Sequence, residues 1–164
     1  MQYNPPEFEK KITAPDDLIN KISQIKQATP LVFTNGCFDI LHRGHVTYLA
    51  QARSLGNSMI VALNTDASVK RQGKGDDRPM NKLDDRLRVI ASLQDVDYVT
   101  WFDEDTPYNL IQLIKPEILV KGGDWSIDKI VGSREVLAYG GSVHSIPFLF
   151  DTSTTKLINK IRHV

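Results

Sequence analysis

Short apolar runs alternate with amphipathic segments along most of this sequence, which is the pattern of a parallel sheet covered by helices. The runs that predict strands lie at residues 31–34, 59–63, 98–102, 118–120 and 142–146. The amphipathic segments predict helices at residues 16–27, 44–55, 83–93, 107–114, 128–138 and 153–162, with a shorter helix at 66–71. Helical and extended segments therefore follow one another in regular order along the chain.

The length of 164 residues favours a single domain. We interpret residues 1–29 as an N-terminal lead-in and helix that pack on this domain, which spans residues 30–164. Five strand–helix units in one domain predict an α/β fold of the Rossmann-like, doubly wound kind, with helices on both faces of a parallel five-stranded sheet. Ligands of such sheets bind in the crevice at the carboxyl ends of the strands, so the loops that leave those ends should carry the chemistry.

Composition narrows the class of partner and the compartment. Twenty basic residues balance twenty acidic ones, so no strong net field attracts nucleic acid or an anionic membrane, and we expect neither as a partner. No apolar run approaches the roughly 18 residues that span a bilayer, and the N-terminus has no features of a signal peptide. Cys37 is the only cysteine, which excludes an internal disulfide. These observations predict a soluble, cytoplasmic protein.

The stretch TNGCFDILHRGH, at residues 34–45, follows the first predicted strand and opens the next helix. A helix start offers unpaired N–H groups and partial positive charge, which favour phosphate. His42 and His45 are three residues apart and can face one phosphate, while Gly44 allows close approach to the backbone. A single loop histidine is often only a surface or capping residue, but two at this spacing favour a site. Zinc would need a third ligand, and no H-E-x-x-H pattern is present.

The same stretch resembles the signature of the H-x-G-H nucleotidyltransferases, the cytidylyltransferase-like superfamily. The resemblance covers about residues 31–161, with further matches in LNTD (63–66), DDR (84–86), KGGDW (121–125) and STTK (153–156). Together these motifs are most similar to those of the bacterial D-glycero-β-D-manno-heptose 1-phosphate adenylyltransferases. That family includes free enzymes and second domains of bifunctional kinase–adenylyltransferases. Because no kinase domain precedes the motif here, we expect the free-standing form.

The resemblance implies transfer of AMP from ATP to the heptose 1-phosphate, with release of pyrophosphate, in lipopolysaccharide core biosynthesis. Displacement would be direct and in line, so catalysis would rest on positioning and charge stabilisation. Mg²⁺ is expected on the phosphates of ATP, without a metal cage made by the protein. The resemblance also implies a homodimer or a larger homo-oligomer, with residues 30–164 as the nucleotidyltransferase domain.

Site residues follow from the matching motifs. Catalytic roles are implied for His42, His45 and Arg86. Nucleotide contacts are implied for Thr34, Asn35, Gly36, Phe38, Gly44, Lys121, Gly122, Asp124, Ser153, Thr154 and Thr155. Acceptor contacts are implied for Asp39, Asp66, Lys70 and Trp125. Structural alternatives stay open for several of them: Asp39, Asp66 and the hydroxyls near residue 153 could simply cap helices. In addition, Lys70, Arg71, Lys74 and Arg78 could close a charged loop over the triphosphate.

Two alternatives remain beside this interpretation. A glycerol 3-phosphate or related cytidylyltransferase is the first, because backbone contacts largely select the base. Its branch places an arginine near the position of Phe148, and the pantetheine and nicotinamide branches place one at Ile158, so both departures favour the heptose branch. A nucleotide-binding sensor without turnover is the second, although a sensor would not need both histidines.

Overall fold

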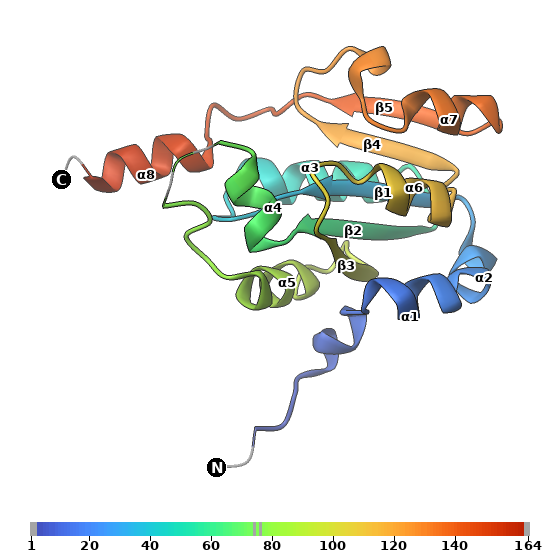
Figure 1. Cartoon of the computed structure of the whole chain (residues 1–164), viewed down its shortest axis with the longest axis horizontal. Coiled ribbons are helices and arrows are strands. Elements are labelled where there is room, and N and C mark those ends of the chain that lie inside the picture. The colour runs from blue at the N-terminus through green and yellow to red at the C-terminus, as the bar shows by residue number, and fades with distance from the viewer. Residues whose placement is uncertain (1–2, 74, 76, 163–164) are drawn as a thin grey trace.

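The computed structural model describes residues 3–73, 75 and 77–162. At its centre all five strands run parallel, in the order β3-β2-β1-β4-β5 (Figure 1). The strands are β1 (Leu31–Gly36), β2 (Ser58–Asn64), β3 (Tyr98–Phe102), β4 (Ile118–Gly122) and β5 (Ser142–Ile146). The predicted doubly wound α/β fold is confirmed. Because strand order reverses between β1 and β4, a crevice is expected at their carboxyl ends.

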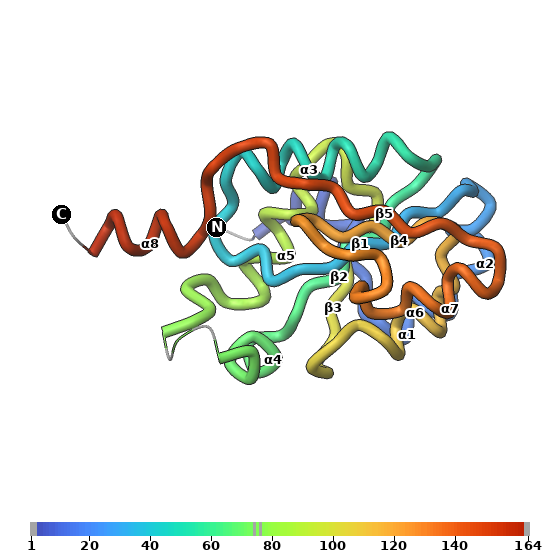
Figure 2. Tube along the Cα trace, turned by 90° about the horizontal axis from the view of Figure 1, so that it is seen from above, coloured from blue at the N-terminus to red at the C-terminus, as the bar shows by residue number. Residues whose placement is uncertain are grey.

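Helices cover both faces of the sheet (Figure 2). One face packs against α3 (Arg43–Arg53) and α5 (Leu83–Ala91). The other packs against α1 (Pro15–Asn20), α2 (Ile22–Ile25), α6 (Tyr108–Ile114) and α7 (Ser133–Ala138). All seven residues of β2 are buried, as expected for a central strand with both faces covered. Two further helices, α4 (Asp66–Arg71) and α8 (Thr154–Arg162), follow β2 and β5, and α8 extends away from the sheet (Figure 1).

Two predicted helices are interrupted. The helix predicted at 16–27 breaks at Lys21, whose backbone leaves the helical region at φ −95° and ψ 0°, and it ends in a 3₁₀ turn at Lys26–Ala28. The helix predicted at 128–138 begins only at Ser133, because Gly132 has a φ of 84° and separates it from a 3₁₀ turn at Ile127–Lys129. Strands β1 and β4 each extend two residues beyond the prediction, to Gly36 and Gly122.

The segment before β1 lies along the β3 edge of the sheet. A 3₁₀ turn at Glu7–Lys11 leads to Ile12, which forms a parallel bridge with Val99, and the N–H of Thr13 donates to the Val99 carbonyl at 2.9 Å. This segment therefore covers backbone groups that an edge strand would otherwise expose. Within the described part of the chain, no helix is both long and apolar enough to cross a membrane.

Candidate active site

The loop after β1 brings an aromatic ring against a glycine. Phe38 adopts a left-handed conformation, φ 46°, which costs a non-glycine residue about 1–3 kcal/mol. Its ring lies over Gly36, where an added Cβ would stand 2.9 Å from a ring carbon. The same ring meets His45 edge-on, with centroids 5.5 Å apart. Gly36 and Phe38 thus build one wall beside the histidines.

The two histidines form a stacked pair at the start of α3. His42 is the N-cap residue, in an extended conformation, and its side chain makes no capping hydrogen bond. The two rings stack with centroids 3.8 Å apart and an interplanar angle of 30°. A Cβ at Gly44 would lie 3.0 Å from two atoms of the His42 ring, so this glycine leaves room for the imidazole. The predicted convergence of the two imidazoles is therefore present in the structure.

Burial keeps both imidazoles neutral at neutral pH. It lowers the pKa of His45 to about 4, with the neighbouring His42 as a second cause, and it also lowers the pKa of His42. The Nδ1 atoms of both rings are buried without a hydrogen-bond partner among the described residues. Buried polar atoms in folded proteins nearly always have partners.

The burial of His45 also makes folding stability depend on pH. The pKa of His45 falls from 6.5 to about 4 on folding, so the unfolded chain binds more protons between these values. The contribution of the neutral, buried His45 to the free energy of unfolding should be complete above pH 6.5 and be lost as pH falls toward 4. In this window the free energy of unfolding should change with a slope approaching about 1.4 kcal/mol per pH unit. Urea unfolding of the wild type and His45→Asn across this window measures it. Equal slopes in the two proteins would contradict the prediction.

The start of α8 is tied to the loop that precedes His42. The Thr154 hydroxyl donates to the Ile40 carbonyl at 3.1 Å, and the Ser153 hydroxyl accepts from the N–H of Lys156 at 3.2 Å. The capping alternative for Ser153 is therefore realised. Phosphate contacts by Ser153, Thr154 and the exposed Thr155 remain predictions.

Sequence reasoning missed the aromatic cover of the histidines. The Phe148 ring lies edge-on to His45, at 6.1 Å, and to Tyr48, at 5.8 Å. A Cβ at Gly122 would lie 3.0 Å from the Phe148 ring and 3.1 Å from the Tyr48 ring. The Tyr48 hydroxyl in turn hydrogen-bonds Thr34, which is buried, so Thr34 supports the site from within the sheet. The resemblance marked the position of Phe148 only as one near which a related branch has an arginine, and did not predict its packing on the histidines.

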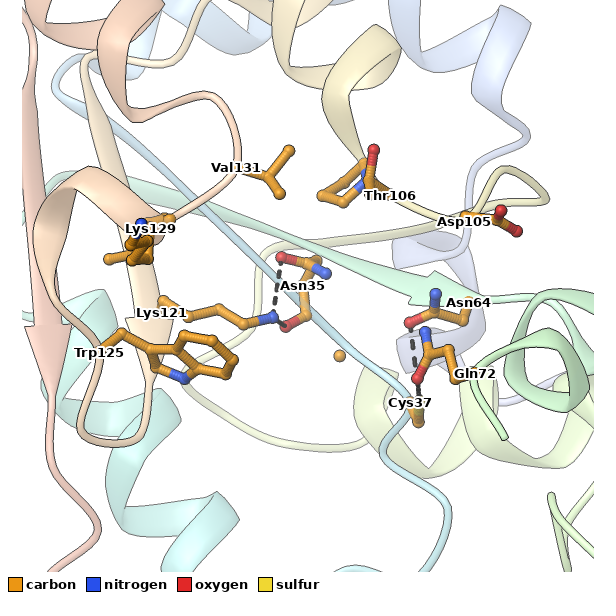
Figure 3. Close-up of a pocket in the computed structure, with 13 residues that line it drawn as sticks. Asn35, Cys37, Asn64, Gln72, Asp105, Thr106, Lys121, Trp125, Lys129 and Val131 are labelled. Atoms are coloured by element: carbon orange, nitrogen blue, oxygen red, sulfur yellow. Dashed lines mark hydrogen bonds between the residues drawn. The ribbon is translucent and has the colours of Figure 1, made fainter. Parts of the chain in front are cut away.

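A cavity of about 370 Å³ opens on the opposite face of the sheet from the histidines (Figure 3). Successive strand residues alternate between faces. Asn35 and Lys121 therefore share the face of Phe33 and Leu119, which pack in the α6 and α7 core. The cavity is lined by Asn35, Gly36, Cys37, Asn64, Gln72, Asp105, Thr106, Pro107, Lys121, Trp125, Lys129, Ile130 and Val131.

Hydrogen bonds fix the part of this cavity next to β1 and β4. The Lys121 ammonium donates to both the backbone carbonyl and the side-chain oxygen of Asn35, each at 3.3 Å. Trp125 donates its indole N–H to the Gly122 carbonyl at 3.1 Å. At Gly123, with φ 113°, a Cβ would stand 2.9 Å from the indole nitrogen, so the double-glycine turn is shaped around Trp125. Asp124 is exposed beside it and does not line the cavity.

The structure does not support the predicted acceptor contact of Asp39. Its side chain is fully buried and accepts from Arg78 Nε at 2.6 Å and from the N–H groups of Met80 and Asn81, each at 2.9 Å. Burial raises the pKa of Asp39, but the N–H groups of Asn81 and Met80, together with Arg78, outweigh burial and hold the pKa below its ordinary value. Nor does Asp39 cap α3, since His42 is the N-cap residue. Its carboxylate instead anchors the segment before α5.

Arg86 also lies inside the protein. Its side chain is fully buried and donates to the carbonyls of Asn81, Cys37 and Asn64 at 3.1, 2.7 and 2.9 Å. It also pairs with Asp66 at 2.7 Å. These contacts argue against the catalytic role implied for Arg86, because nearly all the guanidinium donors face the protein. We assign Arg86 a positioning role that holds the ends of β1 and β2 together.

Several other acidic and basic residues that the sequence singled out make contacts other than those predicted. Thr65, rather than Asp66, caps α4 by accepting from the N–H of Ser68, and the Asp66 side chain stays 39% exposed. Arg71 pairs with Asp105 at 2.7 Å, and Lys70 is exposed on α4. Lys74 lies outside the described residues. The predicted loop cations Arg71 and Arg78 are thus engaged within the protein, and of the four predicted acceptor residues only Trp125 lines the cavity.

Comparisons with known proteins agree with the family that the sequence motifs suggest. The family model described as Cytidylyltransferase-like matches residues 33–160. The chain is 51% identical over 155 residues to the D-beta-D-heptose 1-phosphate adenylyltransferase of Bordetella bronchiseptica, covering 94% of this chain and 96% of that protein. It is 50% identical over 150 residues to the bifunctional protein HldE of a Marinomonas species, covering 91% of this chain. The chain spans 31% of the length of that bifunctional relative.

Solved structures have related folds. The lipopolysaccharide core biosynthesis protein of Thermoplasma volcanium matches with a TM-score of 0.58 and 27% identity, over 72% of this chain and 94% of that one. The pantoate-beta-alanine ligase of Francisella tularensis matches with a TM-score of 0.61 and 17% identity, over 93% of this chain and 78% of that one. At this low identity the second likeness concerns the fold alone.

Proposed function

This chain belongs to the cytidylyltransferase-like family, and we propose on that basis that it transfers AMP from ATP to D-glycero-β-D-manno-heptose 1-phosphate. The products would be ADP-D-glycero-β-D-manno-heptose and pyrophosphate, in lipopolysaccharide core biosynthesis. The high identity to a relative named for this activity supports the choice of substrates. The observation that carries the chemistry is the stacked pair of neutral histidines at the start of α3, across the strand ends from an open cavity.

The two substrates would bind on opposite faces of the sheet. The triphosphate fits the α3 side, where His42, His45 and the start of α8 offer donors. We place the acceptor in the cavity on the α6 and α7 side, so Asn35 and Lys121, which the resemblance implied as nucleotide contacts, would instead face the acceptor. Gly36 and Gly122 end the two strands between these regions. On the histidine side, the Phe38 ring packs against Gly36 and the Phe148 ring against Gly122, so these rings separate the two regions.

The reaction would be a direct displacement. An oxygen of the acceptor phosphate attacks the α-phosphorus of ATP, a new P–O bond forms, and the bond to the β-phosphate bridging oxygen breaks as pyrophosphate leaves. The N–H groups of His42 and His45 would donate to phosphate oxygens whose charge grows in the transition state. Such donors are effective here because the rings are already held by stacking, so little reorganisation is needed.

The donor set on this edge suits magnesium bound through the nucleotide. The described residues include no group of three or more His, Cys, Asp or Glu side chains that could hold a metal ion. We propose that Mg²⁺ binds to triphosphate oxygens and water, where it neutralises phosphate charge. From family resemblance we also propose a cytoplasmic homodimer or larger homo-oligomer, which analytical ultracentrifugation of the purified protein tests.

Pyrophosphate release tests the proposed function. ATP or CTP would each be offered with the heptose 1-phosphate or with glycerol 3-phosphate, in the presence of magnesium, and the products identified by mass. We expect release only with ATP and the heptose, together with ADP-heptose. Turnover of CTP with glycerol 3-phosphate would instead identify a cytidylyltransferase. Tight nucleotide binding without turnover of any pair would favour a sensor.

A further inference from the structure

The cavity beside β1 has two chemically different ends (Figure 3). Lys121, Trp125 and Lys129 lie toward one end, on β4 and the segment after it. The other end presents the side-chain amides of Asn64 and Gln72. Positive charge is thus concentrated at one end, while the other offers two carboxamides beside the Asp105 carboxylate, which pairs with Arg71.

Both carboxamides at this end are held by the protein, and Asn64 Oδ1 accepts from the Cys37 thiol at 3.7 Å. Asn64 is 2% exposed, and its amide donates to Ser68 Oγ at 2.9 Å. Gln72, the C-cap residue of α4, is exposed, and its side-chain oxygen accepts from the Cys37 thiol at 3.3 Å. Figure 3 shows the two carboxamides side by side. A carboxamide both donates and accepts, which matches the hydrogen-bonding capacity of a sugar hydroxyl.

The proposed reaction fixes which end of the acceptor lies where. The attacking phosphate must reach across Gly36 toward the histidines, and Lys121 lies next to Gly36 through its bonds to Asn35. A phosphate is also favoured beside an ammonium group. The sugar must then extend from Lys121, past Asn35, toward the carboxamides of Asn64 and Gln72.

We propose that the acceptor binds with its 1-phosphate at Lys121 and the C7 hydroxyl of the heptose against Gln72. Gln72 thereby selects a seven-carbon sugar phosphate over a six-carbon one. This inference rests on the proposed adenylyl transfer to heptose 1-phosphate, and it adds the orientation of the acceptor and a residue that determines selectivity.

The test compares two acceptors that differ by one carbon. The KM of the heptose 1-phosphate is measured from ADP-heptose formation, and β-D-mannose 1-phosphate, which lacks C7, is titrated as a competitor. For Gln72→Ala we expect the heptose KM to rise about 3- to 10-fold, the range for one lost neutral hydrogen bond. The inhibition constant of mannose 1-phosphate and the KM of ATP should stay within about 2-fold, because neither ligand would contact Gln72.

Two control variants distinguish a selective rise in the KM of the heptose 1-phosphate from a general loss of folding or activity. Gln72→Met keeps the side-chain length without the carboxamide and should reproduce the shift. Gln94→Ala removes an exposed glutamine that does not line the cavity, and should behave as wild type. Equal weakening of both sugar phosphates, or no change in either, would overturn the inference while leaving adenylyl transfer intact. A wild-type protein that forms no ADP-heptose would overturn the proposed function and this inference with it.

Discussion

Replacing His42 or His45 by alanine should lower turnover by about 10²–10³-fold, equivalent to roughly 2.7–4 kcal/mol of transition-state stabilisation. Each imidazole is neutral, buried at Nδ1 and held by the other ring. A donor held in this way gains most when charge grows on the phosphate oxygens, and gains less in the ground state. We therefore expect the dissociation constant of ATP to change far less than the rate.

Single-turnover rates and ATP binding by calorimetry measure the two quantities separately. His144→Ala provides a matched control, because that histidine lies on β5, where its ring hydrogen-bonds Ser142, and does not line the cavity. The double variant should lose less than the sum of the two single losses in free energy, since the stacked rings support one another. Equal losses in ATP affinity and in turnover would argue against a transition-state role.

The local sequence pattern was sufficient to predict the strands of the sheet and the shared direction of the two histidines. Five apolar runs predicted five strands, because each strand of a covered parallel sheet must be apolar on both faces. The spacing of His42 and His45 predicted a shared direction, because residues three apart meet on a helix. Both features depend on residues close together in the chain.

The features that the sequence did not reveal depend on distant partners or on local backbone conformation. The sequence suggested a site residue at Asp39, but Arg78, 39 residues later in the chain, covers its side chain in the structure. Gln72 belongs to no motif, and only the fold brings it beside Cys37. The breaks at Lys21 and Gly132 are likewise conformations that an apolar pattern does not specify. Tertiary contacts decide the positions of Asp39 and Gln72, whereas the backbone conformations of Lys21 and Gly132 decide the two breaks.

The second large effect is a loss of stability that we expect when the buried Arg86 is replaced. Arg86→Ala should lower the free energy of unfolding by about 3–5 kcal/mol, because it opens a space in the interior and removes the donor from three backbone carbonyls. Asp66 would lose its partner as well, although its partly exposed carboxylate can be hydrated. Urea unfolding at neutral pH measures the loss.

Arg88 supplies the matched control from the same helix. Its side chain is 37% exposed and pairs with Asp84 and Glu9, so Arg88→Ala should lower the free energy of unfolding far less than Arg86→Ala. If Arg86 only positions the strand ends, its alanine variant should lose stability and turnover together. Full stability with abolished turnover would instead mean that Arg86 leaves its buried contacts to touch the substrate phosphates, and would restore a direct catalytic role.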